Sequence, residues 1–456
     1  MNIDQIREII EKEQIDTIKI GGVDIDGVYR GKRIPVREFL GSAWDKGICF
    51  CDVLFGWDIQ NQIYEVPLKF TGWDTGYGDI VAVPDLNTFR VVPGQEKTAS
   101  VLCDYYTEHG EPLNIAPRSV LKKVIAKANE LGFRPYSASE LEFYLFDETL
   151  KTMNDKQFSN PNVLLPGIHC YNLVRSSAVE YIIGEVRRRM DQYNIELEAC
   201  NTEYGPGQFE VNLKYTDALE QADRTVLYKT YIKEIAVEKN LFATFMAKWQ
   251  EGISGNSFHI HQSLWDLNGT QNLFYDANNP HNISDTMRYF AGGVLATLRE
   301  FTALYAPTIN SYKRFVEESY APFNETWGID NRTVACRAIT SSKNGARLEN
   351  RTPGADGNPY LVTAAFLAGG LYGIMNKIEP TKLLVRENGY NLPPEIAKPL
   401  PKNLTESMES LRGSAAAKQF FGEEFIDHYL STRLWEIKVF LKSVTDWERK
   451  RYMEMA

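Results

Sequence analysis

The sequence contains no long apolar run. Among its 456 residues, no stretch approaches the roughly 18 uninterrupted apolar positions that a membrane-spanning helix needs. The first residues, MNIDQIREIIEKEQ, form a charged amphipathic segment without the apolar core of a signal peptide. Together these absences predict a cytoplasmic protein with no membrane partner.

An excess of positive charge is also absent. The chain has 50 Lys and Arg against 60 Asp and Glu, which gives a formal net charge of -10. Nucleic acids are bound by clustered cations, so this balance argues against nucleic acid as the main partner. A small phosphate-bearing substrate remains compatible with the sequence, provided that local cations hold it.

Cysteine is sparse and scattered. Of six cysteines, only Cys49 and Cys51 lie close together, and a C-x-C pair in strand-like sequence is poor spacing for zinc. In a cytosolic chain we expect buried, reduced thiols. The sequence also has no repeat of fixed period and no long low-complexity tract.

The length and a hydrophobic content of 43% predict two domains. Residues 16–35 alternate apolar and polar positions around Asp26-Gly27, which predicts a hairpin in a region of short strands. A helical pattern opens near Pro117-Arg118 or Ser119 and closes at Gly132. We therefore place a domain boundary near residue 105, with domains at 1–105 and 106–456.

The larger region alternates strand-like runs with helical patterns. Apolar strands such as LEFYLF and QFEVNL are separated by helical stretches near 176–192, 217–238, 284–305 and 360–378. The last forty or so residues read as helices. The predicted fold class is α+β with a substantial sheet.

Four carboxylates stand in unusual positions. Glu140 and Glu142 are two apart in an apolar strand, so both project from one face, where they repel each other unless a cation lies between them. Glu203 and Glu210 flank a Gly-Pro-Gly loop that can turn the chain back on itself. A solvated sheet face, or a surface loop that binds nothing, is the alternative interpretation.

Imidazoles are paired in the segment SGNSFHIHQS. His259 and His261 share one face of a predicted strand, and Ser263 continues that face. Histidine binds divalent metals and donates to phosphate, although such a pair also occurs as ordinary core or surface histidine.

Cations concentrate in the following hundred residues. Guanidinium groups bind planar anions such as carboxylate and phosphate in a bidentate manner, and a surface ion-pair network explains any single arginine equally well. The positions are Lys313, Arg314, Arg332, Arg337, Arg347 and Arg351, with Glu349 between the last two. Combined with the carboxylates and histidines, they predict a site for two or more divalent cations, a nucleoside triphosphate and a carboxylate substrate, which is suited to phosphoryl transfer.

In order and spacing, these motifs resemble the glutamine synthetase family along almost the whole chain. The matching segments are DGVYRGKRIP, GDIVAVPDLNTFRVVPG, APRSVL, SELEFYLFD, PGQFEVN, SFHIHQSL, NSYKRFV, NRTVACR, RLENRTPGADGNPYL and GYNLPPE. The resemblance implies an N-terminal β-grasp domain and a catalytic domain with a curved antiparallel sheet. It also implies a homo-oligomer of stacked rings, a decamer or dodecamer, in which a neighbouring subunit closes each active site.

The resemblance further implies residue roles, with ATP and Mg²⁺ or Mn²⁺ as cofactors. Implied metal ligands are Glu142, Glu203 and Glu210 nearer the glutamate, and Glu140, His259 and Glu349 at the ATP phosphates. Implied ATP contacts are His261, Ser263 and Arg347. Implied catalytic cations are Arg332 and Arg337, and implied glutamate-binding positions are Arg314, Arg351, Gly255 and Ser254.

Three departures from the family concern the amine. Ammonia-using members have a flap glutamate where this chain has Tyr320, which is neutral at pH 7. The resemblance places the neighbouring Glu317 and Glu318 outside the pocket. Ser254 replaces an asparagine that touches glutamate in the family, and CDVLFGWD around Asp52 replaces a small polar segment.

These departures resemble the γ-glutamylamide synthetase branch, which ligates organic amines in amine catabolism through a γ-glutamyl phosphate. Phe55, Trp57 and Tyr320 would line an apolar amine pocket, which favours a small alkyl or aryl amine; alternatively, Phe55 and Trp57 belong to the core of the small domain. The rival functions are a γ-glutamylpolyamine synthetase, an ammonia-dependent glutamine synthetase, a relative that has lost catalysis and a guanidino kinase.

Overall fold

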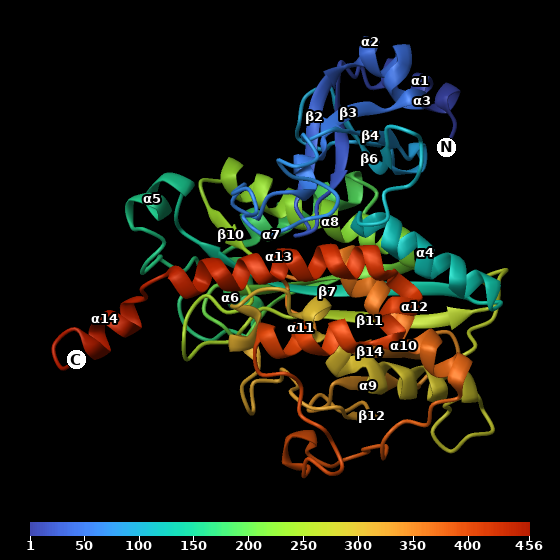
Figure 1. Cartoon of the computed structure of the whole chain (residues 1–456), viewed down its shortest axis with the longest axis vertical. Helices are drawn as coiled ribbons and strands as arrows, with labels where there is room; N and C mark the ends of the chain where they lie inside the picture. Colours follow the sequence, from blue (N-terminus) through green and yellow to red (C-terminus); the bar gives the residue numbers. More distant parts are fainter.

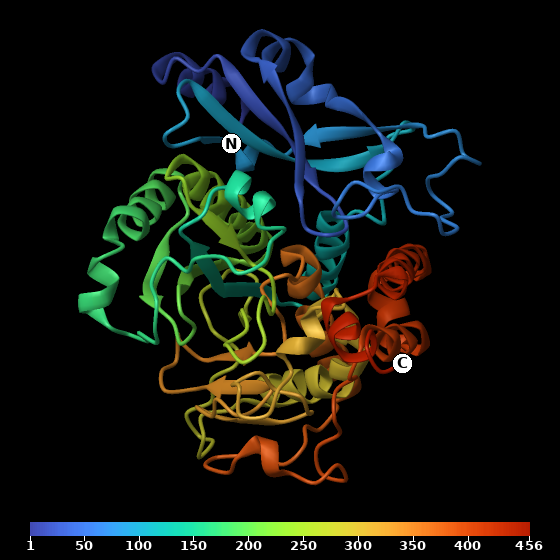
Figure 2. The same ribbon diagram turned by 90° about the vertical axis from the view of Figure 1, so that its left-hand side faces the viewer.

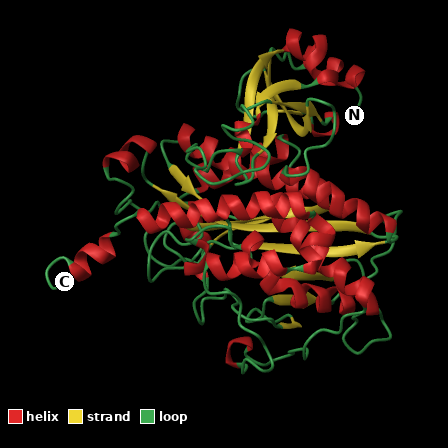
Figure 3. Ribbon diagram, in the orientation of Figure 1, coloured by secondary structure: helices red, strands yellow, loops and turns green.

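The computed structural model describes residues 1–456, and the chain in it buries two separate hydrophobic cores. All residues of the smaller core lie within the first 116 positions. The larger core is formed mostly by later residues, with Val23, Ile25, Val92 and Leu102 added from the N-terminal region. In Figure 1 the N-terminal part, in blue, stands on one side of the larger body. The predicted combination of helices and sheets is confirmed, and strands and helices are distinguished by colour in Figure 3.

The smaller core lies against a six-stranded sheet. Its order is β2-β1-β6-β4-β3, with β5 beside β6, and β1 runs parallel to β6. The expected hairpin at residues 16–35 is present, because Gly27 adopts a φ of 82° in the turn between β1 and β2. The strands are β1 (Thr17–Val23), β2 (Tyr29–Pro35), β3 (Ile48–Cys51), β4 (Asp79–Pro84), β5 (Arg90–Val91) and β6 (Thr98–Thr107).

β6 continues to Thr107, just past the predicted domain boundary, and the next helix begins at Pro117. The division at residue 105 therefore stays a prediction. The expectation of buried cysteines is wrong for Cys49 and Cys51, which are exposed. They alternate with Ile48 and Phe50 on β3, and β3 forms the edge of the sheet, so their side chains face solvent. All six thiols are free.

The larger sheet has eight strands in the order β12-β13-β14-β11-β7-β9-β8, with β10 beside β7. All pairs are antiparallel except β12 with β13. The strands are β7 (Arg134–Phe146), β8 (Leu197–Thr202), β9 (Gln208–Asp217), β10 (Phe242–Thr244), β11 (Phe258–Trp265), β12 (Trp327–Ile329), β13 (Cys336–Ile339) and β14 (Arg347–Asn350).

The long helices lie close to where the sequence predicts them. The expected helix at 176–192 is divided into two, because Ala178 and Val179 interrupt it. Helices before the last forty residues are α1 (Ile3–Lys12), α2 (Val36–Glu38), α3 (Trp44–Lys46), α4 (Pro117–Glu130), α5 (Leu150–Asp155), α6 (Leu173–Ser177), α7 (Glu180–Gln192), α8 (Ala218–Glu238), α9 (Asp285–Tyr305), α10 (Pro359–Asn376) and α11 (Leu404–Gly413). The chain ends with α12 (Ala415–Phe421), α13 (Glu423–Lys442) and α14 (Asp446–Tyr452). None of these helices has the length and apolar character needed to cross a membrane.

Buried ion pairs join the small domain to the large one. Arg118 of α4 donates to Asp104 of β6 at 2.7 Å and to Asp223 of α8 at 2.9 Å. Arg433 of α13 pairs with Asp26 in the β1–β2 turn. Figure 2 shows the small domain, in blue, beside the helices and loops to which these pairs connect it. Because each charge is buried with its partner, losing one partner would leave the other uncompensated.

Helices α9 and α10 pack at glycine contacts. A Cβ on Gly293 would lie 2.2 Å from the carbonyl oxygen of Gly369 and 2.4 Å from the Cα of Gly373. Both neighbours are backbone atoms, which cannot rotate away as a side chain could. The close approach therefore depends on glycine at position 293.

We predict that Gly293→Ala lowers the free energy of unfolding by about 2 kcal/mol or more, because α9 and α10 must separate to admit the methyl group. Thermal unfolding followed by circular dichroism measures the change in midpoint. Gly413→Ala is the matched control, since a Cβ there meets open space. Equal midpoints for the two variants would contradict the packing argument.

Candidate active site

A cavity of about 1730 Å³ opens on one face of the large sheet. Every predicted metal-binding, glutamate-binding and catalytic residue lines it, and of the predicted ATP contacts Arg347 does, whereas His261 and Ser263 do not. These two are buried behind the wall: Arg347 Nε donates to His261 Nδ1 at 3.2 Å, and Trp265 Nε1 donates to the Ser263 hydroxyl at 3.0 Å. Their roles in ATP binding stay predictions.

One cluster of carboxylates lies at the end of the cavity near the Gly-Pro-Gly loop. Oxygens of Glu142, Glu203 and Glu210 lie within 4.8 Å of one another. Strand register creates the first contact, because Glu142 of β7 stands directly opposite Glu210 of β9. Glu203 reaches the same point from the end of β8, where its oxygens accept from Asn201 Nδ2 at 3.0 Å and from the Tyr204 amide at 3.1 Å.

This first cluster carries more negative charge than its surroundings neutralise. Burial, and then the neighbouring Glu203, raise the pKa of Glu142 to about 7. Burial, followed by Glu140 and Glu142, raises the pKa of Glu210 to about 9. Three carboxylates so close together stay ionised only if a cation binds among them.

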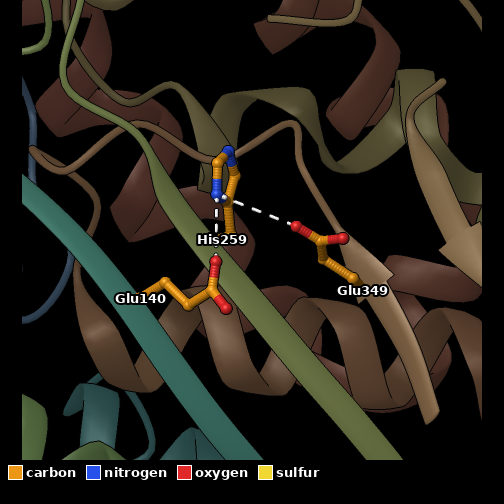
Figure 4. Close-up of side chains that lie close together, drawn as sticks. All are labelled: Glu140, His259 and Glu349. Atoms are coloured by element: carbon orange, nitrogen blue, oxygen red, sulfur yellow. Dashed lines mark ion pairs between the residues drawn. The ribbon is translucent and has the colours of Figure 1, made fainter. Parts of the chain in front are cut away.

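A second cluster is formed by Glu140, His259 and Glu349, whose ligand atoms also lie within 4.8 Å of one another. Figure 4 shows the imidazole of His259 between the two carboxylates. Its Nδ1 lies 3.5 Å from Glu140 Oε2 and 3.8 Å from Glu349 Oε1. Register again explains the contact, since His259 of β11 stands opposite Glu140 of β7.

The second cluster differs from the first because an arginine already compensates it. Arg351 Nη1 donates to Glu349 Oε1 at 2.5 Å, and although burial opposes ionisation, Arg351 holds the pKa of Glu349 at about 2. Burial and then Arg351 lower the pKa of His259 to about 4, so its ring is neutral at pH 7. The buried Nε2 atom of that ring has no hydrogen-bond partner.

Both clusters fit hard divalent cations. Carboxylate oxygens with a neutral imidazole are the donors that such ions take, and two clusters of three ligands leave positions for water or substrate oxygens. The unsatisfied charge of the first cluster is what a bound cation would neutralise. The residues present therefore suit the two metal positions implied by the resemblance.

Arginines supply positive charge to the same cavity. Arg332 lines the cavity and has no ion-pair partner, so its guanidinium is free to meet an anion. Arg337 divides its donors between Glu349 Oε2 at 3.3 Å and Asp330 Oδ1 at 3.0 Å. Arg347 donates to the carbonyl of Gly345 at 2.9 Å. Arg332 is thus the most available cation of the three.

In the loop at residues 253–255, all three backbone carbonyls accept hydrogen bonds from side chains. Tyr144 donates its hydroxyl to the Ser254 carbonyl at 2.8 Å, and Gln208 Nε2 donates to the Gly255 carbonyl at 2.9 Å. Lys248 donates to the carbonyl of Ile253. These hydrogen bonds fix the orientation of successive peptide groups. The backbone N–H groups of the loop can then donate to a ligand beside Arg314. The same Gln208 amide lies 3.2 Å from Glu142 Oε2, which connects the loop to the first cluster.

Sequence reasoning missed Tyr144, Gln208 and Lys248. Tyr144 and Gln208 lie in the motifs SELEFYLFD and PGQFEVN, whose carboxylates were the predicted ligands. Lys248 lies just before a turn in which Gly252 has a φ of 77°. A buried hydroxyl in the strand LEFYLF was the available signal for Tyr144, because such a group needs an acceptor.

The flap at 316–321 corrects the expectation for Glu318. Tyr320 lines the cavity as predicted, but so does Glu318, which the resemblance had placed outside the pocket; Glu317 does not line it. Glu318 and Tyr320 adopt φ values of 58° and 59°, left-handed conformations that no residue pattern predicts here. Ser319 and Ala321 line the cavity as well, so most of the flap backbone lies against it, and this is why Glu318 reaches the wall.

The expected aromatic lining from the small domain is wrong for Phe55. Its side chain is 0% exposed and packs in the small core, edge to face with Tyr105 at a centroid distance of 5.5 Å. Trp57 does not line the cavity; Arg30 lies over its ring at 5.4 Å. Asp52 turns inward as well, accepting from the Thr71 hydroxyl at 2.7 Å. A 3-10 turn at Asp52–Phe55 directs these side chains inward.

Residues 114–452 match the family model for the glutamine synthetase catalytic domain. The chain belongs to the glutamine synthetase family. It is 47% identical to a glutamate–isopropylamine ligase from Pseudomonas sp. over 99% of this chain and 98% of that protein. It is 35% identical to a γ-glutamylethanolamide synthetase from Streptomyces coelicolor, over 100% of this chain and 96% of that one. The ligand-free structure of GmaS superposes with a TM-score of 0.84 at 28% identity, covering 98% of each chain.

We predict that divalent metal affinity rises with pH. In the metal-free protein the raised pKa values of Glu142 and Glu210 mean that binding must displace protons, so affinity is low at acid pH and increases as these groups ionise. Calorimetric titration with Mn²⁺ should show affinity at least about tenfold higher at pH 8.0 than at pH 6.5, with proton release. Glu210→Gln should weaken this dependence, whereas Glu198→Gln, on the cavity wall but outside both clusters, should preserve it. A pH-independent affinity would refute the interpretation.

We predict that Tyr144→Phe raises KM for glutamate by about fivefold, since the 253–255 loop loses one of its three anchors, while kcat changes little. Initial-rate kinetics with varied glutamate measure both constants. Tyr228→Phe is the control, because the buried Tyr228 hydroxyl has no hydrogen-bond partner to lose. If the two variants behave alike, Tyr144 does not position the loop.

Proposed function

We propose that this chain joins the γ-carboxylate of glutamate to a small organic amine, with conversion of ATP to ADP and phosphate. Its two ligand clusters and the unpaired Arg332 line one cavity, and this combination of metal-binding carboxylates with a free cation is the observation that carries the proposal. Full-length similarity to relatives named as glutamate–isopropylamine ligase and γ-glutamylethanolamide synthetase supports an organic amine as the acceptor.

The reaction needs activation because a carboxylate is a poor electrophile. The γ-carboxylate takes the γ-phosphoryl group of ATP to become an acyl phosphate, and the amine then displaces phosphate. Metals bound by the two clusters, Mg²⁺ or Mn²⁺, would neutralise phosphate oxygens. Arg332 and Arg337 stabilise charge on the transferred group, and Arg347, with His261 and Ser263 behind it, holds the nucleotide.

Glutamate is positioned by cations and by backbone. Arg314 is buried and held by the carbonyl of Thr352, so its guanidinium is fixed beside the Gly255 backbone. A Cβ on Gly255 would lie 2.7 Å from Arg314 Cγ, which explains why this contact requires glycine. Arg351 lies next to the same wall, and Ser254 supplies its amide rather than an asparagine side chain.

The amine enters on the flap side. Tyr320 offers a neutral, largely apolar surface, and Glu318 is the carboxylate that the flap provides for the proton of an alkylammonium ion. Apolar side chains such as Val316 and Tyr171 line the same cavity. A small alkyl or aryl amine gains from this surface, because each buried methylene contributes about 0.8 kcal/mol.

We also propose a β-grasp-type small domain, a cytoplasmic location and a homo-oligomer of stacked rings. The parallel β1–β6 pair is compatible with the first of these. The oligomer is supported by apolar side chains left in solvent: α14 projects from the body in Figure 1, with Trp447 and Met453 exposed. Leu173 and Val174, near the cavity-lining Tyr171, are exposed as well, as a subunit that closes the site would require.

We predict that kcat/KM for isopropylamine or aniline exceeds that for ammonia by at least about tenfold, because ammonia gains nothing from the apolar flap. ATP-dependent phosphate release with glutamate and a panel of amines measures the ratio. Tyr320→Glu should narrow or reverse it by attracting ammonium, whereas Tyr181→Glu, at an exposed position outside the cavity, should leave it unchanged.

Glu318→Gln separates the two kinds of amine in the same assay. It should lower kcat/KM for isopropylamine, which is protonated in solution, more than kcat/KM for aniline, which is neutral. If kcat/KM of the wild-type enzyme is highest for ammonia, the protein is an ammonia-dependent glutamine synthetase. If it is highest for a polyamine, the proposal of an apolar amine pocket is wrong.

A further inference from the structure

A second cavity, of about 540 Å³, lies away from the active site between the small domain and the C-terminal helices. Phe70 and Ile115 form one side, and Leu430 and Leu434 of α13 form another. A volume of this size suits a small molecule, and the apolar side chains suit one with an apolar body.

His428 is a buried polar side chain in the wall of this cavity. Its side chain is buried, with the residue only 5% exposed, and neither ring nitrogen has a hydrogen-bond partner. Burial, and then Arg433, lower the pKa of His428 to about 4, while the Phe55 backbone opposes the shift; the ring is therefore neutral at pH 7. A buried imidazole without a partner costs stability, and a ligand that hydrogen-bonds to it removes that cost.

Four charged side chains, two of each sign, line the same cavity, and only two of them form an ion pair. Asp427 pairs with Lys69 at 2.5 Å, so these two charges compensate each other. Arg412, at the end of α11, has no ion-pair partner, and Glu424 is held only by the neutral Asn114 amide at 3.0 Å. Arg412 and Glu424 do not reach each other, which leaves one free cation and one free anion facing a common space.

We propose that this cavity binds a zwitterionic α-amino acid whose side chain is apolar along its length and ends in a hydrogen-bonding group. The carboxylate of the ligand pairs with Arg412 and its ammonium group with Glu424. The side chain extends over Phe70 and Leu430 and reaches His428 with its polar end. No residue of the catalytic cavity takes part, so the site is independent of the proposed ligase activity.

The probe is 3-iodo-L-tyrosine, which has the required head group, an aromatic body and a terminal hydroxyl. Its anomalous scattering locates it in crystals of the full chain, and calorimetry measures its affinity. We expect iodine density in the second cavity, and binding about tenfold weaker in Arg412→Met or Glu424→Gln, because each removes one charge partner. These side chains are exposed, so the variants should fold; Arg386→Met, at an exposed arginine outside both cavities, should bind as the wild type does.

The role of His428 is tested by changing the ligand instead of the protein. 3-Iodo-L-phenylalanine lacks the hydroxyl and should bind about fivefold more weakly than the tyrosine probe. Four results would overturn the proposal: iodine only in the catalytic cavity, binding only at crystal concentration, affinity unaffected by Arg412→Met and Glu424→Gln, or the cavity filled by a segment of a second copy of the chain.

Discussion

Electrostatic repulsion among buried carboxylates is the constraint on which the rest of the site depends. Glu142, Glu203 and Glu210 meet at one point of the sheet face, and no cation of the chain lies among them. Glu349 in the neighbouring cluster is instead compensated by Arg351. The protein thus tolerates one charge-compensated cluster and one that is complete only with a bound cation, which makes metal binding part of the stability of the site.

Cations and backbone amides line the same cavity as these carboxylates. Arg332 is unpaired, Arg314 is fixed by backbone, and the carbonyls of residues 253–255 are turned away by Tyr144, Gln208 and Lys248. The cavity therefore combines free positive charge with carboxylates that need a cation to stay ionised. Gln208 contacts both Glu142 and the Gly255 carbonyl, so one side chain connects the first carboxylate cluster to the 253–255 loop.

The parts of this site that follow from local alternation could be predicted from the sequence. Glu140 with Glu142, and His259 with His261, share faces because strand side chains alternate, and the antiparallel register then brings β7, β9 and β11 together. Phe55 was not predictable in this way, because the 3-10 turn at Asp52–Phe55 breaks the alternation. Long-range hydrogen bonds, such as Tyr144 to Ser254, have no periodic signature at all.

The flap contains a feature that position-by-position comparison with the family does not predict. Tyr320 stands where ammonia-using members of the family have a glutamate, which by itself suggests that the flap has no carboxylate. In the structure Glu318 and Tyr320 both line the cavity, so an acid and an aromatic ring are present together. The residue at one aligned position therefore does not decide whether the flap has a carboxylate, because Glu318 reaches the cavity from two residues away.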